Sequence, residues 1–364
     1  MPQPTPPSNE QQAAAAQAGL VYVSDTEPGI RRFGEIGEFS YRDRDAEPVR
    51  DPDTLERIRL LAIPPAYVGV WICANPRGHL QATGRDARGR KQYRYHARWR
   101  DVRDGSKFER VAAFAQALPI LRLAVRRDLK LPGLPREKVV ATVVALLAQT
   151  LIRIGNEEYA RKNRSFGLTT LRNRHVGRSK GRLAFRFRGK SGQEHDVAIG
   201  HAGLARIVRR CQQLPGQYLF QYIDDEGTLH PLDSGTVNDY LRDAMRADFT
   251  AKDFRTWGGT LAAMVILAQV PLPSADADND AAALERMFVQ TEKAAVTQVA
   301  TLLGNTPAVC RKSYVHPEVF AAWRDSSLAR TLPPRTLIEP LSLQRLERLA
   351  LALLKRRMRS AGRR

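Results

Sequence analysis

The stretch REKVVATVVALLAQTLIRIG, residues 136–155, indicates the secondary structure of the C-terminal part of this chain. Its apolar residues recur at helical spacing, and Pro135 suits the first turn of a helix. The preceding stretch, from about residue 107 to 129, repeats the same spacing. We therefore expect a mainly helical domain, with Arg153 at the end of a long apolar helix.

One run interrupts this helical pattern with alternation of period two. In RLAFRFRGKSGQEHDVAIG, residues 182–200, Phe185 and Phe187 alternate with arginines, and GKSGQ is typical of a turn. The run predicts a β-hairpin with Lys190 at its tip. Helical signals then resume, and the polar, acidic residues 270–282 indicate a loop between two of these helices.

Upstream, residues 19–104 consist of short β-branched and aromatic runs separated by Pro and Gly, as in a small β-rich domain. The fold class predicted is α+β: this β-rich domain, and a mainly α-helical domain over residues 105–340 that carries the hairpin. Residues 1–18 are interpreted as a disordered leader. Residues 341–364 are interpreted as a basic amphipathic helix or tail.

The composition favours a polyanionic partner. The chain has 364 residues, with 58 Lys and Arg against 38 Asp and Glu, a net charge of +20. Each Lys or Arg that meets a phosphate releases a condensed counterion, so such a charge suits nucleic acid. The cysteines are odd in number and far apart, at Cys73, Cys211 and Cys310. Their spacing matches neither a metal site nor a disulfide framework, and it fits a reducing cytoplasm. We see no secretory signal and no membrane span.

The run GNTPAVCRKSYVHP, residues 304–317, contains a candidate nucleophile. Gly304 suits the left-handed position after a helix, and a cap at Thr306 with Pro307 starts the next short helix. Tyr314 ends that helix, beside Arg311 and Lys312. A tyrosine in basic surroundings can attack a phosphodiester, although most such tyrosines are simply packed against a core.

Cleavage of a phosphodiester by a hydroxyl nucleophile needs cationic donors for the phosphate oxygens and an acid for the leaving oxygen. Arginine suits the first task because its planar fork holds two oxygens, and lysine suits the second because its pKa is tunable. The chain supplies these types as Arg153, Lys190, Lys252, Arg255 and Asn305. Each has an ordinary alternative, such as a solvated turn lysine or an ion-paired surface arginine.

The order of these residues resembles the type IB DNA topoisomerases, above all the small form of poxviruses and bacteria. The features that match are an arginine, a hairpin lysine, KD-x-RT, and G-N-T followed nine residues later by tyrosine. The resemblance runs from about Gly19 to Trp323. A second match is GRDARGRKQYRYH, residues 84–96, which is similar to a GRKQY-x-Y segment of the family's N-terminal domain.

The resemblance implies a role for each matched residue. Tyr314 would form a 3′-phosphotyrosyl link, and Arg153 and Arg255 would stabilise the transition state. Lys190 would protonate the departing 5′ oxygen, assisted by Lys252.

Asn305 stands where the family usually has histidine, so it keeps a neutral donor but lacks an imidazolium charge. In the N-terminal domain, Arg90, Lys91, Gln92, Tyr93 and Tyr95 would meet DNA. Tyr93 and Tyr95 would share one face of a strand.

The same resemblance implies an enzyme that needs no ATP, metal or other cofactor. We expect a cytoplasmic, nucleoid-associated monomer that clamps duplex DNA and relaxes supercoils. Two alternatives remain at this point. A tyrosine recombinase shares the chemistry and the Tyr314-Val-His316 pattern, but has histidine where Lys252 stands. A non-catalytic DNA-binding protein would explain the charge without the catalytic set.

Overall fold

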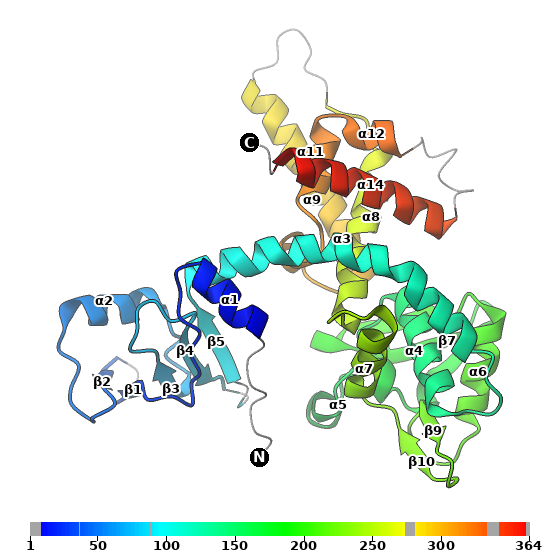
Figure 1. The fold of residues 1–364 in the computed structure, drawn as a ribbon, viewed down its shortest axis with the longest axis horizontal. Helices are drawn as coiled ribbons and strands as arrows, with labels where there is room; N and C mark the ends of the chain where they lie inside the picture. The colour runs from blue at the N-terminus through cyan, green and yellow to red at the C-terminus, as the bar shows by residue number, and fades with distance from the viewer. Residues whose placement is uncertain are drawn as a thin grey trace. The chain divides into compact units, whose positions relative to one another are not determined.

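The computed structural model describes residues 9–35, 37–87, 89, 91–273, 281–332 and 342–361. It contains two compact units, Met1–Glu109 and Arg110–Arg364, which we describe separately. The first is built on a sheet and the second is mainly helical (Figure 1), which confirms the α+β class predicted from the sequence.

The first unit is an antiparallel sheet of strand order β2-β1-β3-β4-β5. Its elements are β1 (Ile30–Phe33), β2 (Ser40–Arg42), α2 (Pro52–Leu60), β3 (Val68–Ile72), β4 (Leu80–Arg85) and β5 (Lys91–Tyr95). Ile58 of α2 packs on Ile30, Val70 and Ile72 of the sheet, so the helix closes the apolar side of these strands. Asp51 caps α2 by accepting from the Thr54 backbone N–H at 2.9 Å.

The start of the chain differs from the predicted disordered leader. Helix α1 (Asn9–Gln17) forms there, and its Ala15 is buried in a cluster with Leu20 and Trp99. A run of alanines favours a helix, and this apolar contact fixes it on the unit. Helix α3 (Ala97–Asp128) also begins earlier than the spacing from about residue 107 indicated. Residues 1–8 lie outside the described part.

The second unit is organised around α4 (Arg136–Thr150), which is buried from Lys138 to Val144 and packs against α6, α7 and α8. The other helices are α5 (Glu157–Asn163), α6 (Ala202–Gln212), α7 (Ser234–Met245), α8 (Ala251–Ala268), α9 (Ala281–Leu303), α10 (Pro307–Ser313), α11 (Glu318–Arg324), α12 (Ser327–Thr331) and α14 (Leu343–Ala361). Among the described residues, no helix is long and apolar enough to cross a bilayer. Of the predicted loop 270–282, residues 274–280 lie outside the description.

The predicted hairpin is present. Strands β7 (Arg182–Arg188) and β8 (Glu194–Ala198) pair antiparallel, with Phe187 opposite His195, and the 3₁₀ turn Lys190–Gly192 joins them. Strand β6 (Val176–Ser179) adds a third strand, and β9 (Gln221–Ile223) pairs separately with β10 (Leu229–Pro231). Phe185 and Phe187 point into the core, as their alternation predicted.

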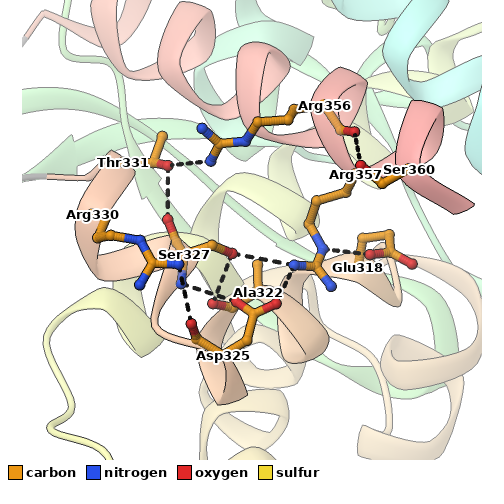
Figure 2. Close-up of polar contacts among 9 residues, drawn as sticks. All are labelled: Glu318, Ala322, Asp325, Ser327, Arg330, Thr331, Arg356, Arg357 and Ser360. Carbon is orange, nitrogen blue, oxygen red and sulfur yellow. Dashed lines mark hydrogen bonds and ion pairs between the residues drawn. The ribbon is translucent and has the colours of Figure 1, made fainter.

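The C-terminal helix α14 is part of the folded second unit. Its Ala350, Leu353 and Leu354 are buried, and it packs against α8, α11 and α12. Figure 2 shows Arg357 of α14 reaching Glu318 of α11 and Asp325, each at 2.5 Å. These contacts tie the chain end to the helices that follow Tyr314.

A second acid–arginine cluster joins α9 to α10 and α11. Glu292 of α9 is 1% exposed and accepts from Arg311 at 2.7 Å and from Arg324 at 2.6 Å. Arg324 also contacts Glu285, whose side chain is exposed, at 2.7 Å. The buried carboxylate therefore holds together the helices on both sides of Tyr314.

We expect Glu292→Gln to destabilise the second unit by about 2 kcal/mol, because neutralising the buried carboxylate weakens its charge-assisted hydrogen bonds to Arg311 and Arg324. The matched control, Glu285→Gln, removes an exposed partner of the same arginine and should cost less than about 1 kcal/mol. Urea denaturation followed by tryptophan fluorescence measures both. Equal losses would contradict the structural role of Glu292.

Candidate active site

Arg153 lies in a segment without regular secondary structure just beyond α4. The helix ends at Thr150, Leu151 takes the left-handed conformation with φ 54°, and no helix or strand is formed from there past Arg153. The sequence placed this arginine at the helix end, whereas it lies three residues beyond Thr150. The Leu168 backbone N–H donates to the Arg153 carbonyl at 2.9 Å, and a Cβ on Gly167 would lie 2.5 Å from that oxygen. The missing side chain at Gly167 therefore permits this close backbone contact.

Arg153 meets the turn between α9 and α10. Its Nη2 donates to the Gly304 carbonyl at 3.0 Å and to Asn305 Oδ1 at 2.5 Å. Gly304 has φ +60°, the left-handed conformation that the sequence predicted. The Nδ2 of Asn305 is buried and has no hydrogen-bond partner among the described residues, so a donor remains available beside the Arg153 guanidinium.

Arg255 is a buried cation in the second turn of α8, 5% exposed. Its Nη1 donates to the Leu151 carbonyl and its Nη2 to the Leu303 carbonyl at 2.6 Å. Its guanidinium carbon lies 5.3 Å from the centre of the Tyr314 ring. Burial lowers the pKa of Arg255, and burial together with the charge of Arg255 lowers the pKa of Arg153. The two arginines and Tyr314 therefore share one partly desolvated region.

Tyr314 ends α10, whose cap is the predicted one. Thr306 accepts from the Val309 backbone N–H, and Pro307 occupies the first turn. Helix α8 packs closely against the tyrosine at Gly259. A Cβ on Gly259 would lie 2.6 Å from the Tyr314 carbonyl oxygen and 3.2 Å from the Tyr314 Cβ. Tyr314 itself is partly buried. The Gly-Gly pair directly after RTW was the sequence signal for this close packing, and it was not used in the prediction.

Arg311, three residues before Tyr314, is engaged in contacts of its own. Arg311 was expected to contribute, but its guanidinium pairs with Glu292 and lies 4.6 Å from the centre of the Phe320 ring. Lys312 is exposed. Arg153 and Arg255, which come from distant segments, both place positive charge near the tyrosine. Cys310 is buried, and burial raises the pKa of its thiol, as expected for a structural cysteine.

Lys190 sits at the hairpin turn, exposed and without a hydrogen bond or ion pair to any described residue. Residues that flank Lys190 in the hairpin hold the turn in place, and Gln193 packs it against Gly304. A Cβ on Gly304 would lie 2.6 Å from Gln193 Oε1, and a Cβ on Gly189 would lie 2.5 Å from His195 Nε2. Packing thus places the hairpin end against the turn that holds Asn305.

His195 is the second residue that sequence reasoning missed. Its ring stacks on Phe187 at 4.7 Å and 11° between planes. Burial, then the charges of Arg153 and Arg255, lower its pKa, so the ring is neutral at pH 7. Its period-two alternation with Val197 and Ile199 was the available signal. Lys252 is exposed in the first turn of α8, one turn before Arg255.

The first unit carries the other predicted contacts on β5. Tyr93 and Tyr95 stack at 6.0 Å and 9°, which confirms that they share a face. Tyr93 is 48% exposed, whereas Tyr95 packs partly against the buried cluster that contains Trp71. Lys91 pairs with Asp25 at 2.5 Å, and Gln92 donates to Asp86 at 2.9 Å. Arg90 lies outside the described residues.

Comparison with known proteins agrees with this arrangement. Residues 96–330 match the model of the eukaryotic DNA topoisomerase I catalytic core, and residues 38–86 match that of the bacterial DNA topoisomerase IB N-terminal domain. The chain is 32% identical over 291 residues to DNA topoisomerase 1B of Acanthamoeba polyphaga mimivirus, covering 79% of this chain and 85% of that protein. It is 21% identical over 273 residues to DNA topoisomerase 1B of Vaccinia virus (strain Copenhagen), covering 71% of this chain and 77% of that protein.

The chain therefore belongs to the type IB DNA topoisomerase family, and the recombinase and the non-catalytic alternatives are set aside. The catalytic-core match spans every candidate residue from Arg153 to Tyr314. The strand with Gln92, Tyr93 and Tyr95 lies between the two matched ranges, and α14 lies beyond them. Within the described residues, no group of three or more His, Cys, Asp or Glu side chains is arranged to hold a metal ion.

The support of Tyr314 by Gly259 is testable. We expect Gly259→Ala to cost about 2 kcal/mol, because the new methyl group meets rigid backbone rather than a flexible side chain. Topoisomerase activity should fall with it, since Tyr314 must shift. Gly258→Ala is the control, because its methyl group meets the Leu151 side chain, which can change rotamer. Urea denaturation and plasmid assays measure both; an unaffected Gly259→Ala enzyme would contradict this close contact.

Proposed function

We propose that this enzyme relaxes supercoiled duplex DNA by cutting one strand through a 3′-phosphotyrosyl link on Tyr314 and then resealing it. The observation that carries the proposal is the meeting of Tyr314 with the guanidinium of Arg255, 5.3 Å from its ring, beside the Arg153–Asn305 pair. These residues come from separate segments of the chain. Their convergence gives a partly desolvated nucleophile two cations and a free amide donor.

In the proposed cleavage step, the Tyr314 oxygen attacks the phosphorus after its proton passes to water. The bond from phosphorus to the 5′ oxygen breaks, and that oxygen leaves as a hydroxyl. Arg153 and Arg255 stabilise the extra charge on the non-bridging oxygens, where partial burial strengthens each interaction. Asn305 donates through the Nδ2 that has no partner in the described structure. It does so as a neutral group.

Lys190 supplies the proton to the leaving 5′ oxygen, with Lys252 assisting from α8. The exposed hairpin lysine suits this role because it pairs with no described residue and lies on the hairpin turn that packs beside Asn305. Resealing is the reverse step, in which the 5′ hydroxyl attacks the phosphotyrosyl link. One phosphoester replaces another in each direction, so the cycle needs neither ATP nor a metal ion, since arginine and lysine carry the charge.

The first unit covers the duplex through β5, so that the monomer closes as a clamp on DNA. Tyr93 is a proposed stacking or groove contact because its ring is exposed, and Lys91, Gln92, Tyr95 and, by sequence alone, Arg90 complete the proposed DNA contacts. The net charge of +20 supports phosphate contacts throughout the chain. We place this activity on chromosomal DNA in the cytoplasm.

The covalent link is the sharpest test of this proposal. We expect SDS to trap protein on supercoiled plasmid in EDTA without ATP, and Tyr314→Phe to abolish the adduct because the attacking oxygen is gone. Tyr159→Phe, an exposed tyrosine on α5, is the control and should trap normally. A persistent adduct in Tyr314→Phe would refute this nucleophile, and loss of the wild-type adduct in EDTA would refute metal independence.

The acid role of Lys190 has its own signature. We expect Lys190→Ala to slow single-turnover cleavage by about 10²-fold or more, as for loss of a general acid. A 5′-bridging phosphorothiolate leaves without a proton, so the defect should largely disappear on that substrate. Lys180→Ala, at the adjoining hairpin turn, is the matched control and should cleave both substrates normally. An equal defect on both substrates for Lys190→Ala would disprove the acid role.

A further inference from the structure

His195 is a partly buried histidine on the hairpin that carries Lys190, and the proposed cleavage step does not use it. It lies on β8 directly opposite Phe187 of β7, and it alternates along its strand with the exposed Glu194 and Asp196. Its imidazole forms no hydrogen bond with a described residue, so packing holds the ring there. The residues that the ring touches therefore indicate what it does.

The imidazole lies against Gly189, the residue immediately before Lys190. A Cβ on Gly189 would lie 2.5 Å from His195 Nε2 and 2.7 Å from its Cδ2, which is too close for a side chain at that position. Gly189 has φ −95°, a value that any residue can adopt, so its backbone conformation does not require glycine. The close approach of the imidazole therefore explains the glycine.

Backbone hydrogen bonds join this contact to the turn. The Gly189 N–H donates to the Gln193 carbonyl at 2.7 Å, and the Gly192 N–H donates to the Gly189 carbonyl at 3.2 Å. Lys190 therefore follows a residue that is held by hydrogen bonds within the turn and by packing on the imidazole. Any shift of Gly189 moves Lys190 with it, because the two are covalently adjacent.

The orientation of the imidazole is fixed by the protein core. The ring stacks on Phe187 with the ring centres 4.7 Å apart and 11° between the planes. Phe187 is 4% exposed, and its ring also meets that of His175 at 6.4 Å. Stacked aromatic rings hold each other in both position and orientation. The core thus fixes Phe187, Phe187 fixes His195, and His195 fixes the residue before Lys190.

The imidazole also suits the electrostatics of the site. His195 lies close enough to Arg153 and Arg255 that their charges, after burial, lower its pKa. A neutral ring can therefore support the turn without placing a further cation beside the two arginines.

We propose that His195 is a positioning residue for Lys190, and that its imidazole holds the hairpin turn where the lysine ammonium reaches the leaving 5′ oxygen. The inference rests on the acid role proposed above and adds the residue that directs it. In the cleavage step the bond from phosphorus to the 5′ oxygen breaks, its electron pair stays on that oxygen, and a proton from Lys190 converts the oxygen to a hydroxyl. His195 neither gives nor takes a proton, and its contribution is the placement of the lysine.

The test compares full-length enzymes on one short duplex that contains a cleavage site mapped by SDS trapping. His195→Ala removes the ring. Asp196→Ala is the matched control, because this exposed neighbour on β8 points to the other side of the strand. Single-turnover formation of the Tyr314 adduct is measured on the phosphodiester and on the 5′-bridging phosphorothiolate, and thermal unfolding checks the fold of each variant.

We expect His195→Ala to slow cleavage of the phosphodiester by about tenfold or more, since misplacing a reacting group by about 1 Å can cost about 10²-fold. On the phosphorothiolate, which leaves without a proton, its rate should match that of the wild type. Asp196→Ala should behave as the wild type on both substrates. With Lys190→Ala already in place, His195→Ala should slow the phosphodiester no further, because both changes impair the same proton transfer.

A second variant approaches the same contact from the turn, and it carries the test by itself if His195→Ala fails to fold. Gly189→Ala places a methyl group against the imidazole and should displace Lys190, with the same defect on the phosphodiester alone. Combined with His195→Ala, which removes the obstacle, it should add little. Gly177→Ala on β6 is the matched control, because a Cβ there meets nothing within 4 Å.

An equal defect of His195→Ala on the two substrates would overturn the inference, because a misplaced acid cannot slow a reaction that needs none. A wild-type rate on the phosphodiester would overturn it as well. Equal defects in Lys190→Ala would refute the acid role itself, and this inference with it. A selective defect in Lys190→Ala beside an unselective one in His195→Ala would refute the role of His195 and leave the acid role intact.

Discussion

The buried guanidinium of Arg255 forms hydrogen bonds that join three helices of the second unit. It donates to the carbonyl of Leu151, just past α4, and to that of Leu303, the last residue of α9. Carbonyls at helix ends have no partner within their own helix, and burying them unpaired is costly. One side chain of α8 therefore closes two helix ends and fixes three helices at one point. The same point lies beside the Tyr314 ring.

The residues next to these hydrogen bonds adopt backbone conformations that are uncommon or need a glycine. Leu151 takes a left-handed conformation although it has a side chain, which costs about 1–2 kcal/mol. Gly304 takes the same conformation at less cost, and Gly259 leaves room for the Tyr314 backbone. Such strain persists only where surrounding contacts over-determine the conformation, and the Arg255 hydrogen bonds are those contacts.

Acid–arginine pairs hold the chain on both sides of Tyr314. Glu292 binds Arg311 before it, and Glu318 binds Arg357 after it. These pairs are partly buried, so they fix geometry more than they add net stability. The Glu292 pair engages the guanidinium of Arg311. Arg153 and Arg255 contribute positive charge near Tyr314, and long-range hydrogen bonds hold them in place.

Features that depend on local periodicity and capping could be predicted from the sequence. The α+β class, the hairpin of Phe187 and His195, and the Thr306-Pro307 cap before Tyr314 follow from residues close together in the chain. Three features could not be predicted from it: the position of Arg153 beyond its helix, the ion pair of Arg311 with Glu292, and the docking of α14 through Glu347. Those outcomes rest on partners far away in sequence, such as the turn at Asn305 or the Glu292 carboxylate. Period and composition specify a helix and its faces, but the choice of partner is made only when distant elements compete for the same buried contacts.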